Sequence, residues 1–281
     1  MPENYNSTLR LVRDRRQPES NEFCRMIDLH CHILPGLDDG PRNIEVSLKM
    51  ARMAATDGVK IVACTSHILP GLYDNTAAKL ITATDELRTA LRQSGIQLDL
   101  VCGADAHMDV QFIQKLAERK IPTLAHSRYV LIEPPYHVAP IRMEQFFFQV
   151  LLAGYVPILT HPERLRWISE RYGMIERLSQ HGVWMQLTAS SLTGRFGREP
   201  RYWAERMLCE GRVHVIATDA HDTHNRPPDL SLGWEAAAKR VGDREATHMV
   251  LTRPRGVLEN EPPSDLPVPF GLQSIAVPGT A

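Results

Sequence analysis

The stretch IDLHCH, residues 27–32, decides how this 281-residue chain is interpreted. An apolar run, Phe23–Leu29, is typical of a buried strand, and two histidines follow it directly. His30 and His32 are separated by one residue, so in an extended segment both side chains point the same way. Two imidazoles that face one point suit a d-block cation. By itself, however, a His-x-His pair is a weak signal for a metal site.

The same arrangement recurs along the chain. Further groups of His, Asp or Glu residues are present, and most of them directly follow a short apolar run that predicts a strand. They are Asp38-Asp39-Gly40, Thr65-Ser66-His67, Asp105, Glu133, His161-Pro162-Glu163-Arg164 and Asp219-Ala220-His221. Each has an ordinary alternative: Asp-Asp-Gly is typical of a turn, a lone histidine of a hydrogen-bonded core side chain, and Glu133 could cap the next segment. The repeated placement at strand ends favours ligands.

Strand-like and helix-like segments alternate between residues 23 and 253. Helices are expected at Ile44–Thr56 and Ala77–Arg92, for example, and strands at Lys60–Cys64, Leu98–Cys102 and Val156–Leu159. Roughly seven βα units with short connections predict a parallel α/β sheet. An open doubly wound sheet would place a ligand at one switch point. Candidate ligands at nearly every strand end instead favour a closed barrel with its site at the C-terminal mouth.

Composition narrows the class of protein. The net charge of −1 gives no overall attraction to nucleic acid or to an anionic membrane, so neither partner is expected. Five scattered cysteines, with no Cys-x-x-Cys pair and no signal peptide, predict a cytoplasmic protein with reduced thiols and no membrane insertion. We expect a polar extension at residues 1–22, a single barrel domain at residues 23–253 and a proline-rich tail at residues 254–281.

Several motifs together resemble the PHP (polymerase and histidinol phosphatase) superfamily. Within it they are most similar to the manganese-dependent protein-tyrosine phosphatases of bacterial capsule and exopolysaccharide operons. The motifs are IDLHCH (27–32), LDDGP (37–41), LIE (131–133), HPER (161–164), QLTASSLTGRFG (186–197) and TDAH (218–221). The resemblance covers about residues 26–250. It implies a distorted seven-stranded (β/α) barrel that holds up to three metal ions.

The resemblance also implies roles for single residues. One ion would be held by His30, His32, Asp219 and a shared carboxylate at Asp105, a second by Asp105, Glu133 and His161, and a third by Asp39, His67 and His221. Asp38 is the less favoured of the two adjacent acids. The family's shared carboxylate is a glutamate, and Asp105 is one methylene shorter, which would weaken or rebuild a bridge between two ions. His107, two residues on, could compensate as an extra ligand.

Two arginines match basic positions of the family. Arg164 and Arg226 would neutralise the phosphate oxygens, and a surface ion pair is the alternative role for both, above all for Arg226, which precedes Pro227. His221 could serve as a general acid, although a phenolate leaves without much protonation. A cysteine-nucleophile phosphatase is excluded because none of the five cysteines is followed by an arginine six residues later.

The implied reaction is phosphotyrosine hydrolysis by metal-activated hydroxide. Its expected substrate is the phosphotyrosine tail of a bacterial tyrosine autokinase that controls capsule or exopolysaccharide synthesis. Mn²⁺ is the expected metal, and Fe, Co or Zn would suit the same ligands. Two alternatives stay open. One is a PHP phosphatase for histidinol phosphate or a sugar phosphate, and the other is a phosphotyrosine-binding scaffold with weak activity. The sequence also leaves open whether the chain forms a homo-oligomer.

Overall fold

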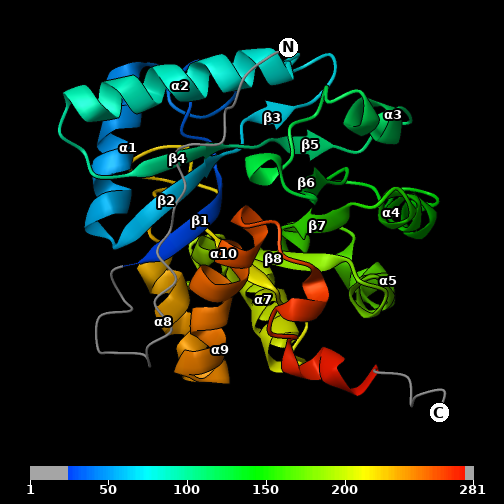
Figure 1. The fold of residues 1–281 in the computed structure, drawn as a ribbon. Helices are drawn as coiled ribbons and strands as arrows, with labels where there is room; N and C mark the ends of the chain where they lie inside the picture. The colour runs from blue at the N-terminus through cyan, green and yellow to red at the C-terminus, as the bar shows by residue number, and fades with distance from the viewer. Residues whose placement is uncertain (1–24, 276–281) are drawn as a thin grey trace.

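The structure, a computed structural model, describes residues 25–275, so the predicted extension at residues 1–22 lies outside it (Figure 1). Strands and helices alternate along most of the chain. They are β1 (Met26–Cys31), α1 (Ile44–Thr56), β2 (Val59–Cys64), β3 (His67–Ile68), α2 (Ala77–Gln93), β4 (Asp99–Cys102), β5 (Asp105–His107), α3 (Phe112–Ala117), β6 (Tyr129–Glu133), α4 (Met143–Leu152), β7 (Val156–Thr160), α5 (Ile168–Gln180), β8 (Trp184–Thr188), α6 (Ala189–Leu192), α7 (Arg198–Cys209), β9 (Val215–Ala217), α8 (Leu230–Val241), α9 (Asp243–Thr247) and α10 (Arg253–Leu258).

Local sequence explains where the first helices begin and which face they bury. The side chain of Asn43 accepts a hydrogen bond from the amide of Val46 and caps α1, and Thr76 caps α2 in the same way. Leu80, Leu87 and other residues at helical spacing form the buried face of α2. The predicted helix at residues 44–56 is confirmed, and the predicted strands at residues 60–64, 98–102 and 156–159 are found within one residue of their expected ends. The first strand begins at Met26, three residues later than expected.

The strands form two parallel sheets, one with the order β1-β2-β4 and one with the order β3-β5-β6-β7-β8-β9. Figure 1 shows α1 and α2 beside the smaller sheet and α3, α4 and α5 along the outside of the larger one. The predicted α/β fold with parallel strands is therefore confirmed. The single closed seven-stranded barrel is not confirmed, because the hydrogen-bonded ladder divides where β2 passes into β3 and where β4 passes into β5.

The two sheets remain joined at these breaks. The amide of Thr65 donates to the carbonyl of Cys31, and the amide of Asp105 donates to the carbonyl of Thr65. Gly103 allows the close approach at the second break, since a Cβ at this position would lie 2.9 Å from Leu124 Cδ2. The bends keep the first residues of β3 and β5, the candidate ligands His67 and Asp105, beside the end of β1.

A buried carboxylate joins the first strand to the residues after the last one. Asp28 on β1 accepts hydrogen bonds from the amide and the hydroxyl of Thr218 and from the amide of His30. The amide of Asp219 also donates to the carbonyl of His30 at 2.7 Å, and the amide of His32 donates to the carbonyl of Ala220 at 2.9 Å. The residues that follow β1 and β9 are thus held side by side.

The start of the predicted proline-rich tail, residues 254–281, is not separate from the helical part of the domain. Residue 254 lies inside α10, and Val257 and Leu266 are buried. The fully buried Arg253 donates to the carbonyls of Pro267 and His214 and pairs with Glu245, so residues 253–267 pack on the body of the domain. Within residues 25–275, no helix has the length and apolar character needed to cross a bilayer.

Replacement of Asp28 tests the junction between β1 and the end of β9. Asp28→Ala leaves three buried donors without their acceptor, so we expect the free energy of unfolding to fall by about 3 kcal/mol. Asp28→Asn keeps one acceptor oxygen and the side-chain volume, and we expect a loss of only about 1 kcal/mol. Guanidinium unfolding monitored by circular dichroism measures both variants. Equal stability of Asp28→Ala and the wild type would contradict this role.

Candidate metal centre

The two histidines of the opening motif point into one place from the end of β1. His30 Nε2 and His32 Nε2 are 3.1 Å apart, and Asp219 Oδ1 lies 3.3 Å and 3.4 Å from them. The outer nitrogens are fixed, because His30 Nδ1 lies 3.0 Å from Gln186 Oε1 and His32 Nδ1 lies 2.8 Å from Asp38 Oδ2. Both acceptors can take the Nδ1 proton, which directs each Nε2 inward, as in metal-binding histidines. Burial lowers the pKa of His32, but Asp38 and Asp219 raise it to about 10, so a bound cation would have to displace the proton on its Nε2.

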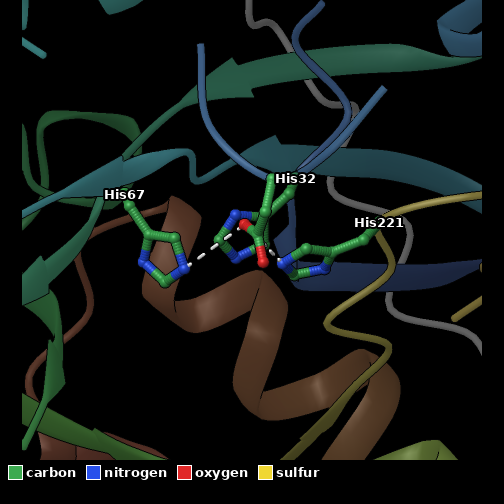
Figure 2. Close-up of side chains that lie close together, drawn as sticks. His32, His67 and His221 are labelled. Carbon is green, nitrogen blue, oxygen red and sulfur yellow. Dashed lines mark ion pairs between the residues drawn. The ribbon is translucent and has the colours of Figure 1, made fainter. Parts of the chain in front are cut away.

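A second group lies beside the first and shares His32 with it. Asp39 Oδ1 is 3.2 Å from His221 Nε2 and 3.7 Å from His67 Nε2. The rings of His32 and His221 stack with their centroids 3.8 Å apart. Figure 2 shows the imidazoles of His32, His67 and His221 turned toward one another from three separate segments of the chain. Their potential ligand atoms and that of Asp39 all lie within 4.8 Å of one another.

A third group contains Asp105 and Glu133. His67 Nδ1 lies 3.4 Å from Asp105 Oδ2 and 3.5 Å from Glu133 Oε2, so His67 completes this group. The resemblance implied His161 as its third member, and His161 Nε2 lies 3.6 Å from Glu133 Oε1. His107 also approaches Glu133, with its Nδ1 3.7 Å from Oε2. All nine predicted ligands thus lie around one centre, and their assignment to individual ions stays a prediction.

The donor atoms of this centre fit a bound cation. Asp105 is fully buried, and among the described residues neither of its oxygens has a hydrogen-bond partner. Such a carboxylate is costly unless a positive charge compensates it. Burial would raise its pKa, but His30 and His67 hold the pKa of Asp105 below its usual range. Positive charge next to Asp105 is therefore what this environment favours.

Two of the imidazoles are neutral at pH 7. Burial and the nearby guanidinium of Arg164 hold the pKa of His161 well below its usual range. Burial and the neighbouring His32 lower the pKa of His221 to about 4. A neutral imidazole offers a lone pair to a metal, so both residues are in the protonation state that a ligand requires.

Two guanidinium groups border the centre. Arg164 and Arg226 both donate to Oδ2 of Asp219, the oxygen opposite the one that faces His30 and His32. Asp219 is 1% exposed, whereas the arginine side chains are 18% and 23% exposed, so they form the solvent side of the site. Arg226 Nη1 also lies 3.7 Å from Oδ2 of the more exposed Asp39, so both of its carboxylate partners are predicted ligands of the centre.

Two residues near the ligands have roles that the sequence did not predict. Gln186 is a buried amide in the apolar strand β8, and it orients His30. Asp38, expected only as a weak ligand candidate, orients His32 and also accepts a hydrogen bond from the amide of His67. A polar residue within an apolar strand was the available signal for Gln186, and the pairing with His30 depends on the fold.

The comparisons with known proteins agree with this arrangement. Residues 26–259 match the family model for capsular polysaccharide synthesis, CpsB/CapC. The chain belongs to the CpsB/CapC family. It is 36% identical to tyrosine-protein phosphatase YwqE of Bacillus subtilis over 236 residues, which cover 84% of this chain and 92% of YwqE. It is 27% identical to tyrosine-protein phosphatase CpsB of Streptococcus pneumoniae over 245 residues, which cover 84% of this chain and 99% of CpsB.

The fold of this CpsB/CapC protein also matches a solved structure. That structure comes from crystallographic work on YwqE and CpsB, described as metal-dependent tyrosine phosphatases. The TM-score is 0.81 at 33% sequence identity, and the match covers 84% of this chain and 96% of the other. The predicted resemblance to the capsule-operon branch is therefore confirmed.

Glu163 of the HPER motif is buried next to the metal centre, but it is not a predicted ligand and instead binds the segment that follows β8. Its Oε1 accepts hydrogen bonds from the amide of Thr188 at 2.9 Å and from Ser191 Oγ at 2.7 Å. Among the described residues, its Oε2 has no hydrogen-bond partner. Burial raises the pKa of Glu163 to about 7 from 4.5. Between about pH 4.5 and pH 7, Glu163 is therefore protonated in the folded protein and ionised in the unfolded chain.

The substitution Glu163→Gln tests whether Glu163 holds this proton in the folded protein. Because the folded pKa is raised, the contribution of Glu163 to stability is full below about pH 4.5 and falls as the pH rises through 7. We expect the stability of Glu163→Gln relative to the wild type to be higher at pH 8 than at pH 5, by up to about 3 kcal/mol. Guanidinium unfolding of both metal-free proteins at the two pH values measures the difference. A difference that does not change with pH would contradict the assignment.

Proposed function

We propose that this CpsB/CapC protein is a metal-dependent protein-tyrosine phosphatase. The observation that carries the proposal is the fully buried carboxylate of Asp105, with neither oxygen hydrogen-bonded among the described residues and with His30 and His67 next to it. Two guanidinium groups border the same centre at Asp219. Such a site suits cations and a phosphate group together. The names of YwqE and CpsB support the same reaction.

We further propose that the strands act as one distorted barrel within a single domain, residues 23–253. If β2–β3 and β4–β5 each count as one bent strand, the nine strands become seven. The backbone bridge between Cys31 and Ala220 supports closure between the first strand and the last. The candidate ligands would then lie at the C-terminal mouth, as in other α/β barrels.

The residues of the centre would hold up to three ions, with Mn²⁺ expected and Fe, Co or Zn compatible. We assign His30, His32, Asp105 and Asp219 to one ion, Asp105, Glu133 and His161 to another, and Asp39, His67 and His221 to the last, and His67 is placed to serve the second ion as well. Bound ions would supply an activated water nucleophile and neutralise phosphate charge. The low pKa of His221 favours a ligand role over that of a general acid.

Arg164 and Arg226 would bind the non-bridging oxygens of the substrate. Both are now directed at Asp219 Oδ2, so their charge is held at the edge of the centre. A phosphoryl dianion accepts the same charged hydrogen bonds as a carboxylate. Because a phenolate is a good leaving group, the arginines and the ions are sufficient without a dedicated acid. We propose the phosphotyrosine tail of a cytoplasmic bacterial tyrosine kinase as the substrate, in the control of capsule or exopolysaccharide synthesis.

Steady-state hydrolysis of a phosphotyrosine peptide, compared with histidinol phosphate, tests the proposal. The protein is stripped of metal, reloaded with Mn²⁺ and assayed before and after loading. We expect Mn²⁺-dependent turnover of the peptide. His30→Ala should lower kcat/KM by more than about 100-fold, because removal of a direct ligand exceeds the effect of an outer one.

The matched control is His181→Ala, which removes an exposed histidine at the end of α5. It should keep full activity. Turnover of histidinol phosphate alone would assign the protein to the small-molecule phosphatases. Binding of the phosphopeptide with no turnover of either substrate would instead identify a scaffold and contradict the proposal.

A further inference from the structure

The segment from Thr188 to Gly197 lies between the two loops that carry Arg164 and Arg226. It follows β8 and contains α6. Its start is tied to the Arg164 loop, because Glu163 accepts hydrogen bonds from Thr188 and Ser191. None of the residues assigned to the ions or to phosphate binding lies in this segment, yet it contacts both arginine loops.

Phe196, near the end of the segment, contacts Arg164. The guanidinium carbon of Arg164 lies 4.8 Å from the centre of the Phe196 ring, within the range of a cation–π interaction. The same guanidinium donates to Asp219 Oδ2. Arg164 is therefore held by the ring and the carboxylate together. If a phosphate took the place of the carboxylate as acceptor, the ring would still keep the guanidinium in position.

Arg195, the preceding residue, contacts the other loop. Its Nη1 donates to the carbonyl of His224 at 3.1 Å, and its Nη2 donates to Asp229 Oδ2 at 3.3 Å. These two partners lie on either side of Arg226 in the sequence. Asp222 orders the same loop, since its Oδ1 accepts from the amides of His224 and Asn225, both at 2.6 Å. The position of Arg226 thus depends on a loop that Arg195 holds.

The backbone of the segment directs these neighbouring side chains to different loops. The amide of Arg195 donates to the carbonyl of Ser190, and the amide of Gly197 donates to the carbonyl of Gly194, which closes a tight turn. Gly194 and Gly197 have φ values of +83° and +94°, a region that favours glycine. The turn presents Phe196 to Arg164 and Arg195 to the loop of Arg226.

We propose that Arg195 and Phe196 are positioning residues that set the places of the Arg164 and Arg226 guanidinium groups. They thereby set the affinity of the site for a phosphate monoester dianion. This inference rests on the proposed function for its substrate, but it concerns phosphate binding and can be measured without turnover.

The test measures the binding of inorganic phosphate to the Mn²⁺-loaded protein by calorimetry, together with bound Mn²⁺ and peptide kinetics. Phe196→Ala should weaken the binding of phosphate about 10-fold, as expected for the loss of a partly desolvated cation–π contact. It should raise KM for the phosphotyrosine peptide more than it lowers kcat, with the same Mn²⁺ content. Phe196→Tyr keeps an aromatic face and should restore the wild-type affinity. Arg195→Ala should also weaken phosphate binding. Arg198 is an exposed arginine at the start of α7, and Arg198→Ala should leave phosphate binding unchanged.

A double-mutant cycle separates positioning from a general structural effect. In an Arg164→Ala background, Phe196→Ala should cause no further loss of phosphate affinity, because its effect passes through Arg164. Phe196→Leu keeps the apolar volume without the aromatic face, so it provides the same test if the alanine variant does not fold. Phosphate binding by Phe196→Leu equal to the wild type, or additive losses in the cycle, would overturn the inference. A wild type that binds phosphate but does not hydrolyse the peptide would refute the proposed function and leave the inference intact.

Discussion

The carboxylate of Asp28 is the constraint on which the rest of the site depends. It is fully buried and joins β1 to Thr218 at the end of β9, although almost 200 residues separate the two positions. This junction places His30 and His32 against Asp219 and His221. The backbone hydrogen bonds from Asp219 to His30 and from His32 to Ala220 reinforce the same junction. The starts of β3 and β5 and the ends of β6 and β7 then enclose the same point.

Carboxylate and imidazole ligand atoms face one another at this centre, and neighbouring charges compensate the atoms that point outward. Asp219 is an example, because its Oδ1 faces two imidazoles and its Oδ2 accepts hydrogen bonds from two arginines. The arginines compensate the outer oxygen, and the inner one stays directed at the candidate metal position. The outer partners Gln186 and Asp38 fix the two rings. Preorganisation of this kind keeps the ligands near their bound geometry.

Much of the fold and most of the centre could be predicted from the sequence. The helix at residues 44–56 followed from its apolar spacing, and the nine predicted ligands lie around one centre because parallel strands end at the same edge. The break of the ladder at Thr65–Ser66 and Gly103–Ala104 could not be predicted, since it arises from hydrogen bonds between strands. The close approach of His67 to Asp105 and Glu133 likewise depends on the register of β3 and β5.

The sequence by itself determined the class of this protein: alternating strands and helices, His and carboxylate residues at strand ends, and motifs specific enough to indicate the CpsB/CapC family. Local periodicity and residue type are sufficient for this because each motif is a short segment. Only the tertiary structure decided which ligand atoms meet, which residues orient them, and that Arg195 and Phe196 reach the loops of both arginines. Several of those contacts join distant segments, since 29 residues separate His224 from Arg195 and 190 separate Thr218 from Asp28, and no local pattern encodes them.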